Sequence, residues 1–208
     1  MQKGIILFDI DRTIFDTDAF SKALGQSLQK VIKKISIEDI QKAKHEFISS
    51  LSAVREFDPE NFITFICKKF NLSDRKSLID VFYGSENKHW FTDFIFPETF
   101  EIFTKLKDDF RFGIYSEGTK KFQNYKFNSL EILPYLDKDL IFIMDHKTNS
   151  EAVSKIPKNS IIIDDKESVC EYLVDNGINT IWLNKKDNWV SDKFQTIHNV
   201  MELPGILL

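Results

Sequence analysis

Short apolar runs alternate with helical stretches along much of the chain, and this alternation constrains the fold more than any other feature. The runs lie at residues 4–9, 111–115, 140–144, 160–164 and 179–183. Helical stretches separate the later runs, at 97–108, 119–128, 149–156 and 166–176, and apolar residues after 184 indicate a last short strand and helix. Strands with intervening helices predict a parallel sheet covered on both faces. We therefore expect an α/β fold with a doubly wound sheet of five or six strands.

A helical segment interrupts this pattern after the first strand. Apolar spacing predicts a first helix over 21–34. A capping box at Ser36 and Asp39 opens a second helix that runs to about Val54. Asp58 and Pro59 start a third helix, and Ser73 opens a fourth. Phenylalanines at helical spacing are expected to form its core. The predicted organisation is an α/β core made of 1–16 and 95–208, with an all-α insert at 17–94.

Composition excludes several classes of protein. The 208 residues carry a net charge of −4 with no basic stripe, so binding to a nucleic-acid polymer is not expected. No stretch approaches the roughly 20 apolar residues that cross a bilayer. The first apolar run ends early, at Asp9, unlike a signal peptide. The two cysteines are far apart, as in a reducing compartment. We expect a cytoplasmic monomer or homodimer with no membrane partner.

Polar side chains follow four of the apolar runs. In chain order they are Asp9 with Asp11, then Ser116, Glu117 and Gly118, then Asp145, His146 and Lys147, and finally Asp164 with Asp165. Each group alone has an ordinary explanation as a turn or helix cap. Ligands of open parallel sheets, however, bind beyond the carboxyl ends of the strands. Four such groups in one chain indicate a functional site at that edge.

The residue types point to metal-assisted phosphoryl transfer. Carboxylate oxygens suit Mg²⁺, which keeps several waters and takes few protein ligands. A divalent cation also compensates acids that are crowded together. A carboxylate can act as a nucleophile, and lysine and serine donors can hold phosphoryl oxygens.

The order of these segments resembles that of the haloacid dehalogenase superfamily of phosphohydrolases. Residues 8–14, FDIDRTI, look like its first motif, and residues 114–118, IYSEG, resemble its second. Lys147 fits the third motif, and residues 161–165, IIIDD, fit the fourth. The resemblance implies a Rossmann-like core with Mg²⁺ as cofactor, and it implies that the helical insert is a cap.

The resemblance also implies a role for each matching residue. Asp9 would be the nucleophile and a metal ligand, and Asp11 the general acid and base, with its backbone carbonyl on the metal. Ser116 and Lys147 would hold the phosphoryl group, and Asp164 and Asp165 would complete the metal site. The substrate- or phosphate-binding set would be Arg12, Thr13, Glu117 and Gly118, with Thr13 supporting the loop.

Two positions leave alternatives open. Arg12 stands where the family commonly has glycine; it contacts substrate or cap, or it is a solvated side chain paired with Asp16 or Asp18. The lysine of the third motif is Lys147 or, alternatively, Lys155. In the insert, the residues that could contact a leaving group, or simply belong to surface or core, are His45, Arg55, His89 and Trp90.

The predicted function is a Mg²⁺-dependent hydrolase that removes phosphate from a small phosphorylated metabolite through an aspartyl-phosphate. Asp11 favours phosphate esters, because relatives that cleave carbon–halogen bonds lack an acid there. The alternatives are a phosphomutase of the same superfamily and a catalytically silent binding protein with this fold. A signalling receiver domain is disfavoured by the order of the motifs.

Overall fold

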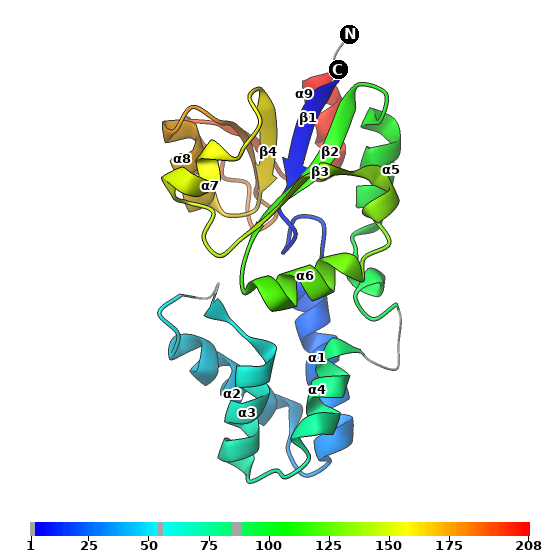
Figure 1. Ribbon diagram of the computed structural model, residues 1–208, viewed down its shortest axis with the longest axis vertical. Helices are drawn as coiled ribbons and strands as arrows, with labels where there is room; N and C mark the ends of the chain where they lie inside the picture. The colour runs from blue at the N-terminus through cyan, green and yellow to red at the C-terminus, as the bar shows by residue number, and fades with distance from the viewer. Residues whose placement is uncertain (1–2, 54–55, 85–88) are drawn as a thin grey trace. The chain divides into compact units, whose positions relative to one another are not determined.

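The structure is a computed structural model that describes residues 3–53, 56–84 and 89–208 (Figure 1). Contacts divide the chain into two compact units. The α/β unit comprises 1–16, 95–117 and 131–208, and the helical unit comprises 17–94 and 118–130. Val54 and Arg55, both named in the sequence predictions, lie outside the described residues.

A six-stranded sheet forms the centre of the α/β unit. Its strands are β1 (Gly4–Phe8), β2 (Phe110–Glu117), β3 (Leu136–Met144), β4 (Ser160–Asp164), β5 (Asn179–Leu183) and β6 (Gln195–Ile197). They lie in the order β3-β2-β1-β4-β5-β6, and every neighbouring pair is parallel. The predicted α/β fold with a doubly wound sheet is confirmed. The strand order reverses between β1 and β4, so ligands are expected at the carboxyl ends of these two strands.

Helices cover both faces of this sheet. They are α5 (Pro97–Leu106), α7 (Ser150–Ser154), α8 (Glu167–Asp175) and α9 (Leu203–Leu207), with short 3₁₀ turns η3 (Leu133–Tyr135) and η4 (Val200–Glu202). Leu7 packs in a buried cluster with Val169 and Leu173 of α8. The next residue, Phe8, points the other way, with its ring 5.5 Å from that of Phe103 in α5. This alternation of successive strand residues explains why β1 is apolar throughout.

The helical unit contains α1 (Thr17–Ile32), α2 (Ile37–Ser49), α3 (Pro59–Phe70), α4 (Arg75–Tyr83), η2 (Thr92–Phe94) and α6 (Lys120–Asn128). Phenylalanines fill its core, as predicted: Phe20, Phe47, Phe62, Phe82 and Phe91 are buried. The predicted caps at Ser36 and Asp58 are also present, since each side chain accepts a backbone N–H three residues on.

Two helix boundaries were predicted wrongly. The second helix ends at Ser49 instead of near Val54, because the Ser50 hydroxyl donates to the Phe47 carbonyl at 2.6 Å and competes with the helix. The fourth helix is capped by Asp74, whose side chain accepts from the Ser77 N–H, and it begins after that residue. Among the described residues, no helix combines the length and apolar character needed to cross a membrane.

Residues 118–130 group with the helical unit, although the sequence pattern places them among the strands and helices of the α/β core. The reason is aromatic packing. The ring of Phe122 in α6 lies 5.5 Å from that of Phe82 in α4, and Tyr125 lies 4.7 Å from Tyr83. The second unit is therefore built from two separate stretches of chain.

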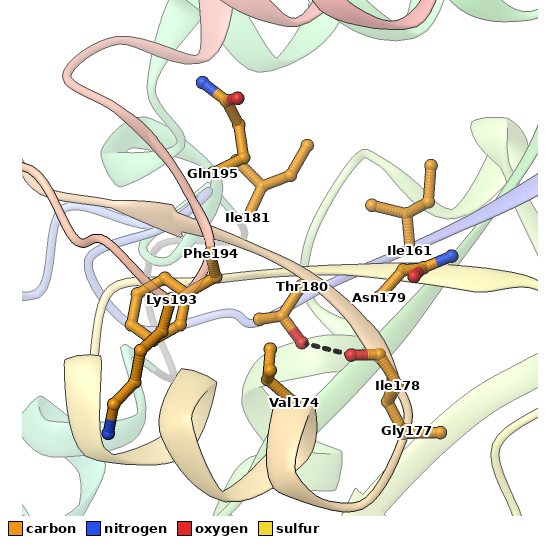
Figure 2. A pocket seen from close by; sticks show the side chains of 10 residues that line it. All are labelled: Ile161, Val174, Gly177, Ile178, Asn179, Thr180, Ile181, Lys193, Phe194 and Gln195. Atoms are coloured by element: carbon orange, nitrogen blue, oxygen red, sulfur yellow. Dashed lines mark hydrogen bonds between the residues drawn. The ribbon is translucent and has the colours of Figure 1, made fainter.

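A pocket of about 440 Å³ lies in the α/β unit at the amino ends of its strands (Figure 2). Its lining includes Ile161 near the start of β4, Asn179 and Gln195 at the starts of β5 and β6, and Phe194. The pocket therefore lies at the amino edge of the sheet. Ligands of open parallel sheets bind at the other edge, beyond the carboxyl ends of the strands.

Candidate active site

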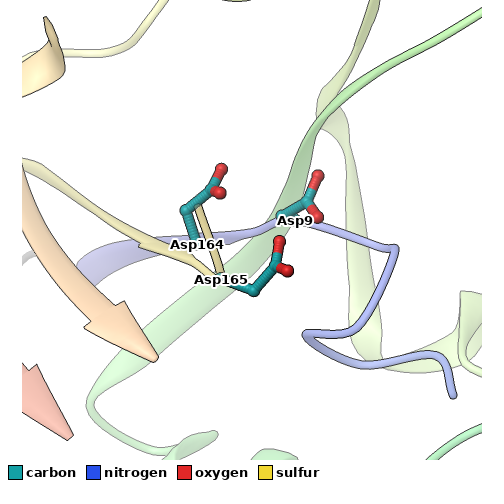
Figure 3. A group of neighbouring side chains, drawn as sticks. All are labelled: Asp9, Asp164 and Asp165. Atoms are coloured by element: carbon teal, nitrogen blue, oxygen red, sulfur yellow. The ribbon is translucent and has the colours of Figure 1, made fainter. Parts of the chain in front are cut away.

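Three carboxylates meet at the point where the strand order reverses. Asp9 directly follows β1, Asp164 is the last residue of β4, and Asp165 comes next. One carboxylate oxygen of each lies within 4.8 Å of those of the other two (Figure 3). Asp9 and Asp164 are buried, and the pairing of β1 with β4 sets their separation. These acids could hold a metal ion. The sequence singles out four acids at these two strand ends, and the fourth, Asp11, is not among the three that meet here.

Lys147 is the cation of this cluster. Its side chain is fully buried, and its Nζ lies 2.8 Å from Oδ1 of Asp9 and 2.5 Å from Oδ2 of Asp164. The alternative, Lys155, is exposed at the end of α7 and forms an ion pair with Glu151 at 2.7 Å. The structure therefore brings Lys147, and not Lys155, to the acids.

Strand β2 fixes the loop that carries Lys147. The hydroxyl of Tyr115 donates to the Lys147 carbonyl at 2.6 Å, and the Lys147 N–H donates to Oε2 of Glu117 at 3.3 Å. The other oxygen of Glu117 accepts from Nζ of Lys166 at 2.9 Å. Glu117, placed in the substrate-binding set by the sequence, is thus engaged by two lysine residues of its own unit. Gly118, the next residue, has a φ of 146°.

Crowding of the acids perturbs their protonation. Burial raises the pKa of Asp164, the charge of Lys147 opposes this, and the charge of Asp9 adds to it. Burial together with the charges of Asp9 and Asp164 raises the pKa of Asp165 to about 7. Burial alone would lower the pKa of Lys147, but the charges of Asp164 and Asp9 outweigh it and raise that pKa, so Lys147 stays protonated.

The donor set fits a hard divalent cation such as Mg²⁺. All three candidate ligands are carboxylates, whose oxygens Mg²⁺ prefers. The single ammonium group of Lys147 that contacts Asp9 and Asp164 does not neutralise three acids. Burial first, and the charges of Asp9 and Asp164 second, raise the pKa of Asp165. Asp9 is bonded to Lys147 through Oδ1, so its Oδ2 is the oxygen not used in that ion pair.

Two buried hydroxyls at this edge have no hydrogen-bond partner among the described residues. They belong to Ser116 in β2 and Thr13 in the loop after β1. Leaving a buried hydroxyl unpaired costs roughly 1–3 kcal/mol. An oxygen-rich ligand would satisfy Ser116, in agreement with the role that the sequence motif implies for it.

Asp11 lies in a tight loop after β1. The Phe15 N–H donates to the Ile10 carbonyl at 2.9 Å, and the Arg12 N–H donates to the Phe15 carbonyl at 2.8 Å. Asp11 is half-buried and forms a β-bridge with Phe15. Arg12 is exposed and has a φ of 61°, a left-handed conformation that suits glycine. The glycine common in the resembled family is explained by this backbone geometry, which the residue pattern alone does not reveal.

Replacing Arg12 with Gly is expected to raise the free energy of unfolding by about 0.5–1 kcal/mol. Relief of the left-handed strain gains roughly 1–2 kcal/mol, and the extra freedom of glycine in the unfolded chain removes part of that gain. Urea unfolding monitored by circular dichroism measures the difference. Arg12→Ala is the control, since it removes the charge but keeps the Cβ atom; equal stabilisation by Ala would contradict the strain explanation.

Two residues that hydrogen-bond to the acids at this edge were not predicted from the sequence. Lys166 donates its backbone N–H to Oδ1 of Asp164 at 2.9 Å and its Nζ to Glu117. The Trp182 indole N–H donates to the Asp165 carbonyl at 3.0 Å. Lys166 directly follows the fourth motif, which is a weak signal. Nothing in the sequence singles out Trp182 within its apolar run.

Solved structures show which fold this is: the chain has the fold of the haloacid dehalogenase-like (HAD) hydrolases. The resemblance drawn from the motifs is confirmed at this level. A HAD-hydrolase from Bacillus subtilis, YfnB, in a magnesium-bound crystal form, is 18% identical, with a TM-score of 0.66 over 100% of this chain and 99% of that one.

Further solved structures show the same fold. A HAD phosphatase from Thermococcus onnurineus is 20% identical, with a TM-score of 0.63 over 99% of this chain and 98% of that one. A haloacid dehalogenase-like hydrolase from Burkholderia xenovorans is 15% identical, with a TM-score of 0.75 over 100% and 97%. Dehalogenases have this fold as well. No family model matches the chain, and no curated protein sequence matches it.

Proposed function

We propose that the protein is a Mg²⁺-dependent phosphatase that acts on a small phosphorylated metabolite through an aspartyl-phosphate. The observation that carries this proposal is the buried Asp9, ion-paired with Lys147 and within 4.8 Å of Asp164 and Asp165 at the switch point. The magnesium-bound YfnB and the Thermococcus phosphatase, which have this fold, support it.

In the proposed reaction, the free carboxylate oxygen of Asp9 attacks phosphorus and the ester P–O bond breaks. Asp11 gives its proton to the leaving oxygen. Asp11 then takes a proton from water, which attacks the aspartyl-phosphate, releases inorganic phosphate and restores Asp9. The Lys147 ammonium and the Ser116 hydroxyl hold phosphoryl oxygens throughout. Mg²⁺ bound by the acid cluster would neutralise charge on the phosphoryl group.

The helical insert, residues 17–94, is the cap in this proposal, because it interrupts the chain between the first and second motifs, where the resembled family carries one. We propose a small-molecule substrate, no nucleic-acid polymer or membrane partner, and a cytoplasmic monomer or homodimer.

A dehalogenase is the competing function, because dehalogenases share the fold. Asp11 separates the two, since departure of a halide needs no proton and departure of an alcohol does. The purified protein should release phosphate from p-nitrophenyl phosphate in the presence of Mg²⁺ and release no halide from chloroacetate. Halide release without phosphate release would replace the proposed function by the competing one.

Magnesium is expected to stabilise the protein more at high pH than at low pH. The folded-state pKa of Asp165, about 7 without metal, lies above its unfolded value of about 3.9. The folded state therefore holds the extra proton between these values, so the metal-free protein loses stability as pH rises through this window. Mg²⁺ removes that penalty, and it competes less with protons at high pH.

The measurement is the unfolding temperature with and without MgCl₂. Mg²⁺ at about ten times its Kd contributes roughly 1.4 kcal/mol, which corresponds to roughly 3–6 °C. We expect this rise at about pH 8 and a much smaller one at about pH 5.5. Asp165→Asn should reduce the pH dependence, and NaCl of equal ionic strength should not reproduce the rise. A shift that is the same at both pH values would contradict binding at these acids.

A further inference from the structure

Lys185 shares the edge of the sheet with the acid cluster, although it belongs to none of the four motifs. Strand β5 lies parallel to β4, with Trp182 opposite Asp164. Lys185 comes two residues after the end of β5 at Leu183. A fifth strand end therefore brings a charged side chain to the carboxyl edge.

The ammonium group of Lys185 contacts the loop that carries Asp11, at Thr13, and the ring of Phe96. Its Nζ lies 3.4 Å from the centroid of the Phe96 ring, and it donates a hydrogen bond to the Thr13 carbonyl at 3.4 Å. The carboxylates of Glu98, Asp16 and Asp165 attract it electrostatically. The ring contact and the bonded carbonyl fix one position for an otherwise exposed side chain.

Asn184 fixes the backbone from which Lys185 extends. It is buried, and its side-chain N–H groups donate to Oδ1 of Asp187 at 2.7 Å and to the Trp189 carbonyl at 3.0 Å. Its side-chain oxygen accepts from the Lys186 N–H at 3.1 Å. Asn184 thus holds the turn after β5 on both sides of Lys185. A residue that positions another group needs such a fixed backbone.

Lys185 acts on a loop that needs external anchors. Three successive loop residues are anchored. The Thr13 carbonyl accepts from Lys185, the Ile14 carbonyl accepts from the Phe96 N–H at 3.0 Å, and Phe15 forms a β-bridge with Ile95. The left-handed Arg12 makes the free loop unfavourable, and such strain persists only where surrounding contacts impose it.

We propose that Lys185 is a positioning residue that clamps the loop of residues 10–15 and thereby orients Asp11 toward the leaving group. The proposal rests on the proposed function for the role of Asp11. Losing the clamp should impair protonation of the leaving oxygen, which matters most when the leaving group is a poor one.

The kinetic test compares phenyl phosphate, which has a poor leaving group, with p-nitrophenyl phosphate, which has a good one. Hydrolysis of the aspartyl-phosphate is common to both substrates, so the comparison uses kcat/KM, which reports formation of that intermediate. Lys185→Met is expected to lower kcat/KM for phenyl phosphate by about tenfold or more and for p-nitrophenyl phosphate by less than about threefold. Lys185→Arg should restore part of the loss, because guanidinium keeps both the charge and the ring contact. Lys186→Met, at the neighbouring exposed lysine, should leave both rates unchanged. Equal losses on both substrates, or none, would overturn the role in proton transfer.

Hydrogen exchange tests the clamp without any need for activity. Amides of residues 11–15 should exchange about tenfold faster in Lys185→Met than in the wild-type protein. Those of β1 and β4 should be unchanged, and Lys186→Met should match the wild type. Unchanged exchange in the loop would overturn the clamp. Faster exchange in a protein that hydrolyses neither ester would leave the clamp standing and refute the phosphatase function instead.

Discussion

Asp9→Asn is expected to lower kcat for p-nitrophenyl phosphate by roughly a thousandfold or more, as the loss of a nucleophile does in other enzymes. An amide oxygen is a poor nucleophile and cannot form the acyl phosphate through which the proposed reaction proceeds. The substitution keeps the shape of the side chain, and the amide oxygen can still accept the hydrogen bond from Lys147. The variant should therefore fold and lose the chemistry.

Trapping the intermediate makes this test specific. Acid quenching during turnover should leave one phosphoryl group on the peptide that contains Asp9 in the wild-type protein and none in Asp9→Asn. Asp139→Asn is the matched control, since Asp139 is an exposed carboxylate on β3, and it should retain full activity. Turnover that survives in Asp9→Asn would refute the nucleophilic mechanism, whatever the substrate.

The fold could be predicted because the sheet is buried on both faces. Strands such as β1 and β4 must then be apolar throughout, and they stand out against the helices between them. The order of the strands, which places Asp9 beside Asp164, is not encoded in any local pattern. It follows from the packing of the whole unit, and the resemblance to a family implied in advance only that Asp9 and Asp164 share a metal site.

Boundaries and groupings were less predictable, because they depend on contacts between distant residues. The Ser50 hydroxyl ends α2 by donating to the Phe47 carbonyl. The spacing of apolar residues does not predict such a bond, so it does not predict where the helix ends. Helix α6 follows β2 in the chain, yet its Phe122 and Tyr125 pack on α4. Spacing predicts that a helix exists and leaves open which core it joins.

The candidate site was predictable where a residue type itself implies the chemistry. The acids Asp9, Asp164 and Asp165 and the cation Lys147 meet as the motifs indicate. The supports were not predictable: Lys185 reaches Thr13 from a strand end that carries no motif, and the left-handed φ of Arg12 belongs to the backbone. Such positions become visible only once the geometry is known.

Lys147→Met is expected to lower the free energy of unfolding of the metal-free protein by about 3–5 kcal/mol near neutral pH. Methionine fills similar space but leaves Asp9 and Asp164 buried together without their counter-charge. Lys155→Met is the matched control, because its ion pair with Glu151 is exposed and contributes at most about 0.5 kcal/mol. Similar losses in the two variants would contradict the assignment of Lys147 to the acid cluster.

The pH and metal dependence of this loss identify its cause. Burial already raises the folded-state pKa of Asp164 above its unfolded value near 3.9. In Lys147→Met this pKa should rise further, because the opposing charge of Lys147 is lost. The folded variant then binds more protons than its unfolded chain, so its stability falls as pH rises, and the deficit relative to wild type should narrow toward about pH 4. Mg²⁺ supplies the missing positive charge and should restore part of the stability at neutral pH, which guanidinium chloride titrations with and without MgCl₂ would measure. A deficit that neither acid nor Mg²⁺ reduces would mean that lost packing, and not uncompensated charge, causes it.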